Sequence, residues 1–344
     1  MHLSLAPFSL TPAEEAALAE LYRRGTPANT LRAWERDLAY ITAWKAAAYG
    51  GPLDWPESET VALRFLLEHS ADLTDADGPA REVAEALIRA GLRRGLACPA
   101  PATLDRRIAS WRAFHRMKNL PSPFEAPLIA QARGRARRAA ARPRQRKSEN
   151  PITREVLEAM LATCDHSHRG LRDRAGLMLG WASGGRRRSE IVALDREDID
   201  DRDFAFEGLL RIRLLSTKTT GQEAAPRLPL KGRAARAVMV WLTMARIESG
   251  PLFRPVSLSD RVLKRRLTPD GFRGIIRHRL ELAGYPPGFA SAHGLRSGFL
   301  TQAALDGAPL PAAMQLSLHR SANQAQQYYV DVDITKNPAT DLLG

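Results

Sequence analysis

The strongest constraint on how this chain can fold is a basic segment between residues 133 and 147. It contains no acidic residue, and an unbroken basic strip of this kind is typical of a linker between two domains. A chain of 344 residues also exceeds the usual size of a single core. The sequence therefore predicts a first domain over residues 1–132, a basic linker over 133–150 and a second domain over 151–344. The basic residues of this segment are Arg133, Arg135, Arg137, Arg138, Arg142, Arg144, Arg146 and Lys147.

The charge of the whole chain restricts its partners. A formal net charge of +13 and a pI near 10.4 indicate a polyanion, and nucleic acid fits best. The sequence has no apolar run of the roughly 18 residues that a membrane span needs. Residues 1–20 lack a signal-peptide pattern, so we expect a cytoplasmic protein. Cys98 and Cys164 lie far apart, which excludes a disulfide framework and a cysteine-based zinc site.

The first domain is predicted to be entirely helical. Thr11 can cap a helix in which Pro12 takes the first position and Glu14 closes a capping box, and Gly25 can end it. Helical patterns separated by Gly, Pro and Asp predict further helices over residues 30–48, 57–69, 79–90 and 102–118.

The helix over residues 102–118 has an apolar side and a basic side. Its apolar side includes Trp111 and His115, so His115 is predicted to be a packed core residue. On the basic side Asp105 is the only acid, whereas exposed helices usually mix charges. We therefore expect this side and the basic segment to contact DNA, although a solvated surface and a simple tether are alternatives. The candidates are Arg106, Arg112, Arg116, Lys118, Arg135, Arg138 and Arg144.

The second domain is predicted to be mainly helical with a small β-hairpin. Thr153 starts a helix, and residues 171–182 form an apolar core helix. Two apolar runs, 209–215 and 225–230, flank Thr219, Thr220 and Gly221 and predict a hairpin, in which two prolines restrict the second run to an edge strand. The residues beyond Gly232 are predicted to be helical again.

Four short stretches of the second domain place polar residues within otherwise apolar helical sequence. Taken singly, each has an ordinary explanation, such as a solvated helix end, a turn lysine or one face of a helix. The stretches are Gly185 to Ile191, Ser216 to Thr219, His293 to Arg296, and His319 to Tyr329.

In this order the four stretches resemble the tyrosine recombinase, or phage integrase, family, and within it the Cre-type recombinases. The family pattern is Arg-x-x-Glu, a hairpin Lys, His-x-x-Arg, and a His or Trp nine residues before a Tyr. Weaker similarity covers the helical first domain, including Asn29 to Arg32, which adds Arg32 to the candidate DNA contacts. The matching residues are Arg187, Glu190, Lys218, His293, Arg296, His319 and Tyr328.

The resemblance implies a fold, a reaction and a partner. The fold is a helical, SAM-like core-binding domain followed by a mixed α/β, mostly helical catalytic domain. The reaction is site-specific recombination of double-stranded DNA through a Holliday junction, carried out by four self-associated protomers. Members of this family work on the DNA of bacteria, phages or plasmids. The chain departs from the pattern at Arg186 and Arg188, where the family is often apolar, and at Leu318, where it usually has Gly.

The expected chemistry gives each matching residue a role. Cleavage of a phosphodiester by a side chain needs a nucleophile, cations on the non-bridging oxygens and a proton for the leaving 5′ oxygen. Tyr328 would attack and form a 3′-phosphotyrosyl bond, which keeps the phosphodiester energy, so that neither ATP nor a metal or other cofactor is required. The remaining roles are a phosphate clamp for Arg187 and Arg296, a phosphate donor for His319, a base for His293, a general acid for Lys218 and a supporting hydrogen bond from Glu190.

Three other functions fit parts of the sequence. A type IB topoisomerase uses nearly the same chemistry to relax one duplex, and a catalytically silent DNA-binding protein would explain the charge equally well. A metal-dependent nuclease could use Cys164, Asp165, His166 and His168, but these residues crowd one loop without a distant partner. The presence of all the expected catalytic side chains favours a recombinase.

Overall fold

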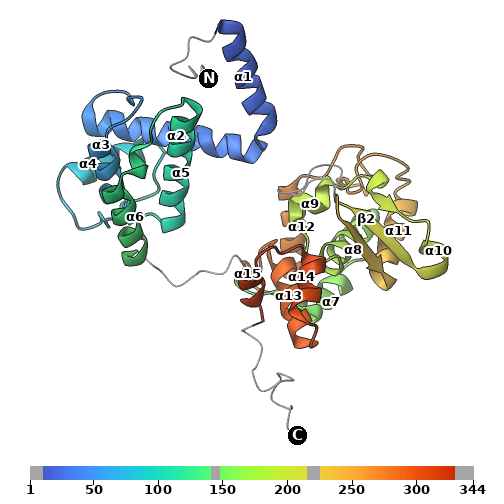
Figure 1. Ribbon diagram of the computed structural model, residues 1–344. Coiled ribbons are helices and arrows are strands. Elements are labelled where there is room, and N and C mark those ends of the chain that lie inside the picture. Colours follow the sequence, from blue (N-terminus) through green and yellow to red (C-terminus); the bar gives the residue numbers. More distant parts are fainter. Residues whose placement is uncertain (1–10, 141–147, 215–224, 330–344) are drawn as a thin grey trace, which may run out of the picture. The chain divides into compact units, whose positions relative to one another are not determined.

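The computed structural model describes residues 11–140, 148–214 and 225–329 (Figure 1). The chain divides into two compact units, Met1–Pro143 and Arg144–Gly344. No helix in these described ranges is long and apolar enough to cross a membrane. The fold class agrees with the sequence prediction, since helices dominate the described residues and a small three-stranded sheet lies in the second unit.

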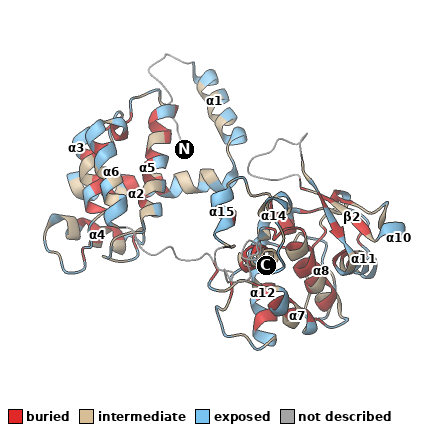
Figure 2. Cartoon of the chain, turned by 60° about the horizontal axis from the view of Figure 1, so that its bottom comes forward, coloured by how far each residue is buried: buried red, intermediate tan, exposed pale blue. Residues whose placement is uncertain are grey.

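The described part of the first unit, residues 11–140, is built from helices without a strand. The first helix begins at the predicted capping box, because the Thr11 side chain accepts a hydrogen bond from the backbone of Glu14 and the Glu14 carboxylate accepts one from that of Thr11. This helix has no buried residue, as its tan and pale blue colours in Figure 2 indicate. The helices are α1 (Pro12–Gly25), α2 (Ala28–Tyr49), α3 (Glu59–Glu68), α4 (Pro79–Arg89), α5 (Pro101–Met117), the 3₁₀ turn η1 (Pro123–Glu125) and α6 (Pro127–Ala139).

An aromatic cluster forms the core of the first unit. Trp44, Phe65 and Trp111 pack edge to face, and the Trp44 indole donates a 2.7 Å hydrogen bond to Glu68. His115 is fully buried, and its Nε2 accepts a hydrogen bond from the backbone of Glu57. The prediction that His115 is a core residue is confirmed.

Helix α6 was not predicted from the sequence, and it includes residues 133–139 of the expected linker. Pro127 occupies its first turn, and alanine and arginine favour helix formation. The charge repulsion is relieved in part by Asp105 of α5, which forms ion pairs with Arg133 at 2.7 Å and Arg137 at 2.5 Å. The basic segment therefore begins as a helix held against the first unit.

The second unit packs helices around a small antiparallel sheet with strand order β1-β2-β3. In the described ranges β3 lies at the edge of the sheet, as its prolines predicted, and Pro229 pairs with Arg211. Residues beyond Gly232 are not all helical: 245–268 are mostly irregular, because Gly250, Pro251 and Pro255 interrupt the helical pattern. The elements are α7 (Arg154–Ala162), α8 (His168–Ala182), α9 (Arg188–Ala193), η2 (Arg196–Asp198), β1 (Ile199–Asp200), α10 (Phe204–Glu207), β2 (Leu209–Arg213), β3 (Arg227–Lys231), α11 (Gly232–Met244), α12 (Pro269–Leu282), α13 (Gly294–Leu305), α14 (Leu310–Ser317) and α15 (Ala322–Gln326).

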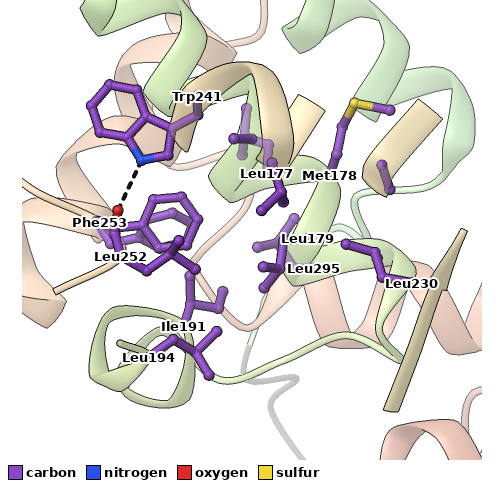
Figure 3. Packing of buried hydrophobic residues seen from close by; sticks show 14 of the residues in the cluster. Leu177, Met178, Leu179, Ile191, Leu194, Leu230, Trp241, Leu252, Phe253 and Leu295 are labelled. Carbon is purple, nitrogen blue, oxygen red and sulfur yellow. Dashed lines mark hydrogen bonds between the residues drawn. The ribbon is translucent and has the colours of Figure 1, made fainter. Parts of the chain in front are cut away.

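The core of the second unit joins the helices that carry the motif residues (Figure 3). Leu179 of α8, Ile191 of α9 and Leu295 of α13 are fully buried in one cluster. Trp241 of α11 closes the cluster on another side, where its indole donates a 2.8 Å hydrogen bond to the Leu252 carbonyl. This packing fixes the ends of α8, α9 and α13 relative to one another.

A buried ion triad ties α8 to α12. Asp173 is 1% exposed, and its two carboxylate oxygens bind Arg172 at 2.6 Å and Arg279 at 2.8 Å. Arg279 also donates to the Thr163 carbonyl at the end of α7. The triad thus connects three helices of the second unit through groups with little access to water.

We predict that Asp173→Ala lowers the free energy of unfolding by about 3–5 kcal/mol, because it leaves two buried guanidinium groups without their shared anion. Glu158→Ala is the matched control, since the Glu158–Arg233 pair is largely exposed and is expected to contribute less than about 1 kcal/mol. Urea unfolding measures both. Equal losses in the two variants would contradict this account of the triad.

Candidate active site

The turn between α8 and α9 contains the start of the first motif, Gly185 to Ile191, and lies against α13. Gly185 has φ of +70°, and a side-chain carbon there would collide with the Arg296 backbone. Only glycine combines that conformation with so close an approach. The carbonyl of Gly185 in turn accepts a 3.2 Å hydrogen bond from the Arg296 guanidinium.

The three consecutive arginines of this turn have three different surroundings. Arg186 is 1% exposed and points into the protein, where it donates to the Leu316 carbonyl. Arg187 is half exposed and binds the buried carboxylate of Glu190 at 2.5 Å. Arg188 forms a 3.1 Å ion pair with Asp270. Of the three, Arg187 is the arginine whose guanidinium is half exposed to solvent while a buried carboxylate holds it in place.

His293 and Tyr328 meet although 35 residues separate them in the sequence. His293 precedes α13, Tyr328 follows α15, and His293 Nε2 lies 3.1 Å from the Tyr328 hydroxyl. The neighbouring Tyr329 points elsewhere, since its hydroxyl donates a 3.1 Å hydrogen bond to the Ala308 carbonyl. A histidine within hydrogen-bond reach can accept the proton of a tyrosine that attacks an electrophile.

Arg296 and His319 form the second half of the same site. Arg296 is 3% exposed, and its Nε and Nη2 lie 3.2 and 3.1 Å from the two ring nitrogens of His319. Burial, followed by the charges of Arg186 and Arg187, lowers the pKa of Arg296 to about 10. Arg296 therefore remains a cation at neutral pH and can bind an anionic group.

Burial, followed by the charge of Arg296, lowers the pKa of His319 to about 3. Its imidazole is therefore neutral at neutral pH and keeps one N–H donor. Ser317 Oγ lies 2.8 Å from Nδ1 and restrains the ring. The preceding Leu318 adopts a left-handed conformation with φ of +54°, so leucine takes the backbone form that glycine usually supplies at such a turn.

The site thus gathers a hydroxyl, two imidazoles and two guanidinium groups from α9, α13 and the segments that follow α14 and α15. The rings of His319 and Tyr328 are 6.3 Å apart between centroids. Cations of this kind can neutralise the charge on the non-bridging oxygens of a phosphate while the hydroxyl attacks the phosphorus. Lys218 lies outside the described residues.

Residues 150–335 match the model of the phage integrase family, which covers every element of this site. The chain belongs to the phage integrase family. It is therefore a tyrosine-type site-specific recombinase, as the sequence predicted.

Curated relatives of this phage integrase member extend the likeness to most of the chain. It is 27% identical to an integrase/recombinase XerD homologue of Selenomonas ruminantium, over 92% of this chain and 85% of the relative. It is 29% identical to tyrosine recombinase XerC of Rhodospirillum centenum, over 91% of this chain and 80% of that relative. These relatives are of the XerC and XerD type and are not specifically Cre-like.

A solved structure supports the fold of this integrase-family chain. The Tn1549 transposon integrase in complex with transposon right-end DNA superposes with a TM-score of 0.58 at 14% identity. The superposition covers 96% of this chain and 99% of the integrase chain. At this identity the likeness concerns the fold.

The predicted DNA contacts of the integrase-family chain lie in different environments. Arg106 is paired with the buried Asp37, Arg112 lies 3.4 Å from Glu125, and Lys118 lies 5.2 Å from the centre of the Trp55 ring. Arg144 is outside the described residues. The exposed members are Arg32, Arg106, Arg116, Arg135 and Arg138.

Sequence reasoning missed Ser317 and the burial of Arg186. The sequence did not favour a metal site at residues 164–168, and three of the four residues considered there have other surroundings in the structure. Cys164 is buried, Asp165 binds Ser167 at the start of α8, and His168 contacts Asp260. In the part of the chain that the structure describes, no cluster of His, Cys, Asp and Glu has the form of a metal site.

Proposed function

We propose that this chain cleaves and rejoins DNA strands at a specific site through a covalent bond between Tyr328 and a 3′ phosphate. The observation that carries this proposal is the 3.1 Å contact between the Tyr328 hydroxyl and His293, beside the Arg296–His319 pair of the same chain. A silent DNA-binding protein would have no use for a hydroxyl, a base and a phosphate clamp held together.

Each site residue then takes one step of the reaction. Arg187 and Arg296 bind the non-bridging oxygens of the phosphate, and His319 donates a further hydrogen bond to them. His293 accepts the proton of Tyr328, while Glu190 holds Arg187. Lys218 protonates the leaving 5′ oxygen. A 5′ hydroxyl from another strand reverses the step, which completes an exchange without external energy.

The experiment that tests this function is a covalent capture. The protein is incubated with nicked fragments of the genome that encodes it, denatured with detergent, and the DNA that remains attached is sequenced. We expect fragments that share one site and are joined through their 3′ ends. Absence of attached DNA from all fragments would overturn the proposed function.

We also propose the assembly and the DNA contacts that such an exchange requires. Two duplexes with two cleavage sites each need four protomers around one Holliday junction. Both units contact the same duplex, the linker crosses between them, and the reaction takes place on the DNA in the bacterial cytoplasm. Residues 337–343, which lie outside the described ranges, dock on a neighbouring protomer in the manner of the Cre type.

We predict that Arg135→Gln with Arg138→Gln weakens DNA binding and lowers the slope of log affinity against log salt by about 2, because each lost phosphate contact removes roughly one unit. Both arginines are exposed on α6 and form no ion pair among the described residues. Arg133→Gln with Arg137→Gln removes the same charge from residues already paired with Asp105, so its slope should change less. An unchanged slope in the first variant would make the segment a tether.

A further inference from the structure

Arg186 is the most deeply buried charge beside the site, and the reaction as described above does not use it. Its side chain is 1% exposed, and burial lowers its pKa to about 10, so it stays a cation at neutral pH. Its Nε has no hydrogen-bond partner among the residues that the structure describes. Buried charges with incomplete partners usually cost stability relative to an apolar residue of similar size. Stability alone therefore does not account for an arginine at this position.

The contacts of Arg186 connect two parts of the site. Its Nη2 donates to the Leu316 carbonyl at 2.7 Å and to the Gly184 carbonyl at 3.3 Å. Its Nη1 lies 3.8 Å from the Glu190 carboxylate, which is the same carboxylate that holds Arg187. The guanidinium is thus anchored at α9 and reaches the last turn of α14.

The position of Leu316 determines that of His319. Leu316 lies in the last turn of α14, and only Ser317 and the left-handed Leu318 separate it from His319. A side-chain carbon on Gly184 would collide with the Leu316 carbonyl, so the two backbones are already in contact. A hydrogen bond to that carbonyl fixes the end of the helix from which the His319 ring projects.

We propose that Arg186 is a positioning residue for His319, and that its guanidinium, anchored by Glu190, holds the Leu316 carbonyl so that the imidazole faces the phosphate bound by Arg187. This inference rests on the proposed recombinase function and adds to it a residue that does not touch DNA. It also accounts for the chain's departure from the apolar residue that the family often has at this position.

The test compares Arg186→Met with Arg188→Met, which makes the same chemical change at a partly exposed residue two positions away. Three quantities are measured for each: the rate of covalent adduct formation on nicked site DNA, the affinity for that DNA, and the melting temperature. We expect Arg186→Met to form the adduct about 10–100-fold more slowly, the scale of misplaced supporting residues, with parental affinity and no loss of melting temperature. Arg188→Met should stay within about twofold of the parent. Arg186→Lys, which keeps the charge but offers a smaller donor, should lie between.

A double-mutant cycle with His319→Ala identifies the route of the effect. If Arg186 acts through His319, Arg186→Met should slow the reaction by less than about threefold once the imidazole is absent. Three outcomes overturn the inference. The first is that Arg186→Met slows adduct formation as much in the His319→Ala background as in the parent. The others are that Arg186→Met reacts at the parental rate, or that it loses DNA affinity by the same factor as it loses rate. Should Arg186→Met fail to fold, Arg186→Lys takes its place in the test. The inference is then overturned if Arg186→Lys forms the adduct at the parental rate both with His319 present and in the His319→Ala background. An inactive parent would refute the recombinase function instead, which keeps the two failures distinct.

Discussion

Tyr328→Phe should abolish the covalent protein–DNA adduct while leaving DNA binding at the parental level. The change removes one oxygen, and with it the atom that forms the bond to phosphorus. Losses of at least about 10⁴-fold are usual when the nucleophile of a covalent enzyme is removed. The lost hydrogen bond to His293 contributes only about 1 kcal/mol to local structure, so folding should be preserved. Adduct formation on nicked DNA and a binding titration measure the two effects.

Tyr329→Phe is the matched control for this variant. It removes the same atom from the adjacent residue, whose hydroxyl is bound to the Ala308 carbonyl and lies outside the group formed by His293, Arg296 and His319. We expect adduct formation within a few fold of the parent. An adduct that persists in Tyr328→Phe and disappears in Tyr329→Phe would reverse the assignment of the nucleophile.

Features that depend on neighbouring residues could be predicted from the sequence. The capping box at Thr11 needs only Pro12 and Glu14, and the helices over residues 79–90 and 102–118 follow from local spacing and breakers. Helix α6 escaped prediction because the density of like charge favoured a linker, and part of that charge is neutralised by Asp105 on another helix. A count of charges along the chain contains no information about that pairing.

The same distinction holds in the site. The resemblance to the family assigned His293 and Tyr328 to one reaction, and in the structure His293 Nε2 lies 3.1 Å from the Tyr328 hydroxyl. The three arginines 186–188 look alike in sequence, however, and their separate roles depend on partners up to 130 residues away. Burial of Arg186 against Leu316 is a consequence of how α14 packs on the α8–α9 turn, which no local pattern encodes.

Sulfur substitution of the leaving oxygen should separate the residues that supply a proton from those that bind the phosphate. Lys218→Ala is expected to slow cleavage of ordinary DNA by about 10²–10⁴-fold, the usual contribution of a general acid. Arg296→Ala should slow it by at least about 10²-fold, because the buried guanidinium is a fixed donor for charge that develops on the non-bridging oxygens. On ordinary DNA the two variants therefore look alike.

On DNA whose leaving 5′ oxygen is replaced by sulfur, the two variants should form the adduct at different rates. A thiolate leaves without a proton, so Lys218→Ala should recover to within about tenfold of the parent on the same substrate. Arg296→Ala should not recover, since the non-bridging oxygens that it binds are unchanged and His319 has lost the partner of both its ring nitrogens. Rates of adduct formation on the two substrates give the comparison directly. Recovery of Arg296→Ala would place Arg296 in proton transfer, and failure of Lys218→Ala to recover would remove Lys218 from it.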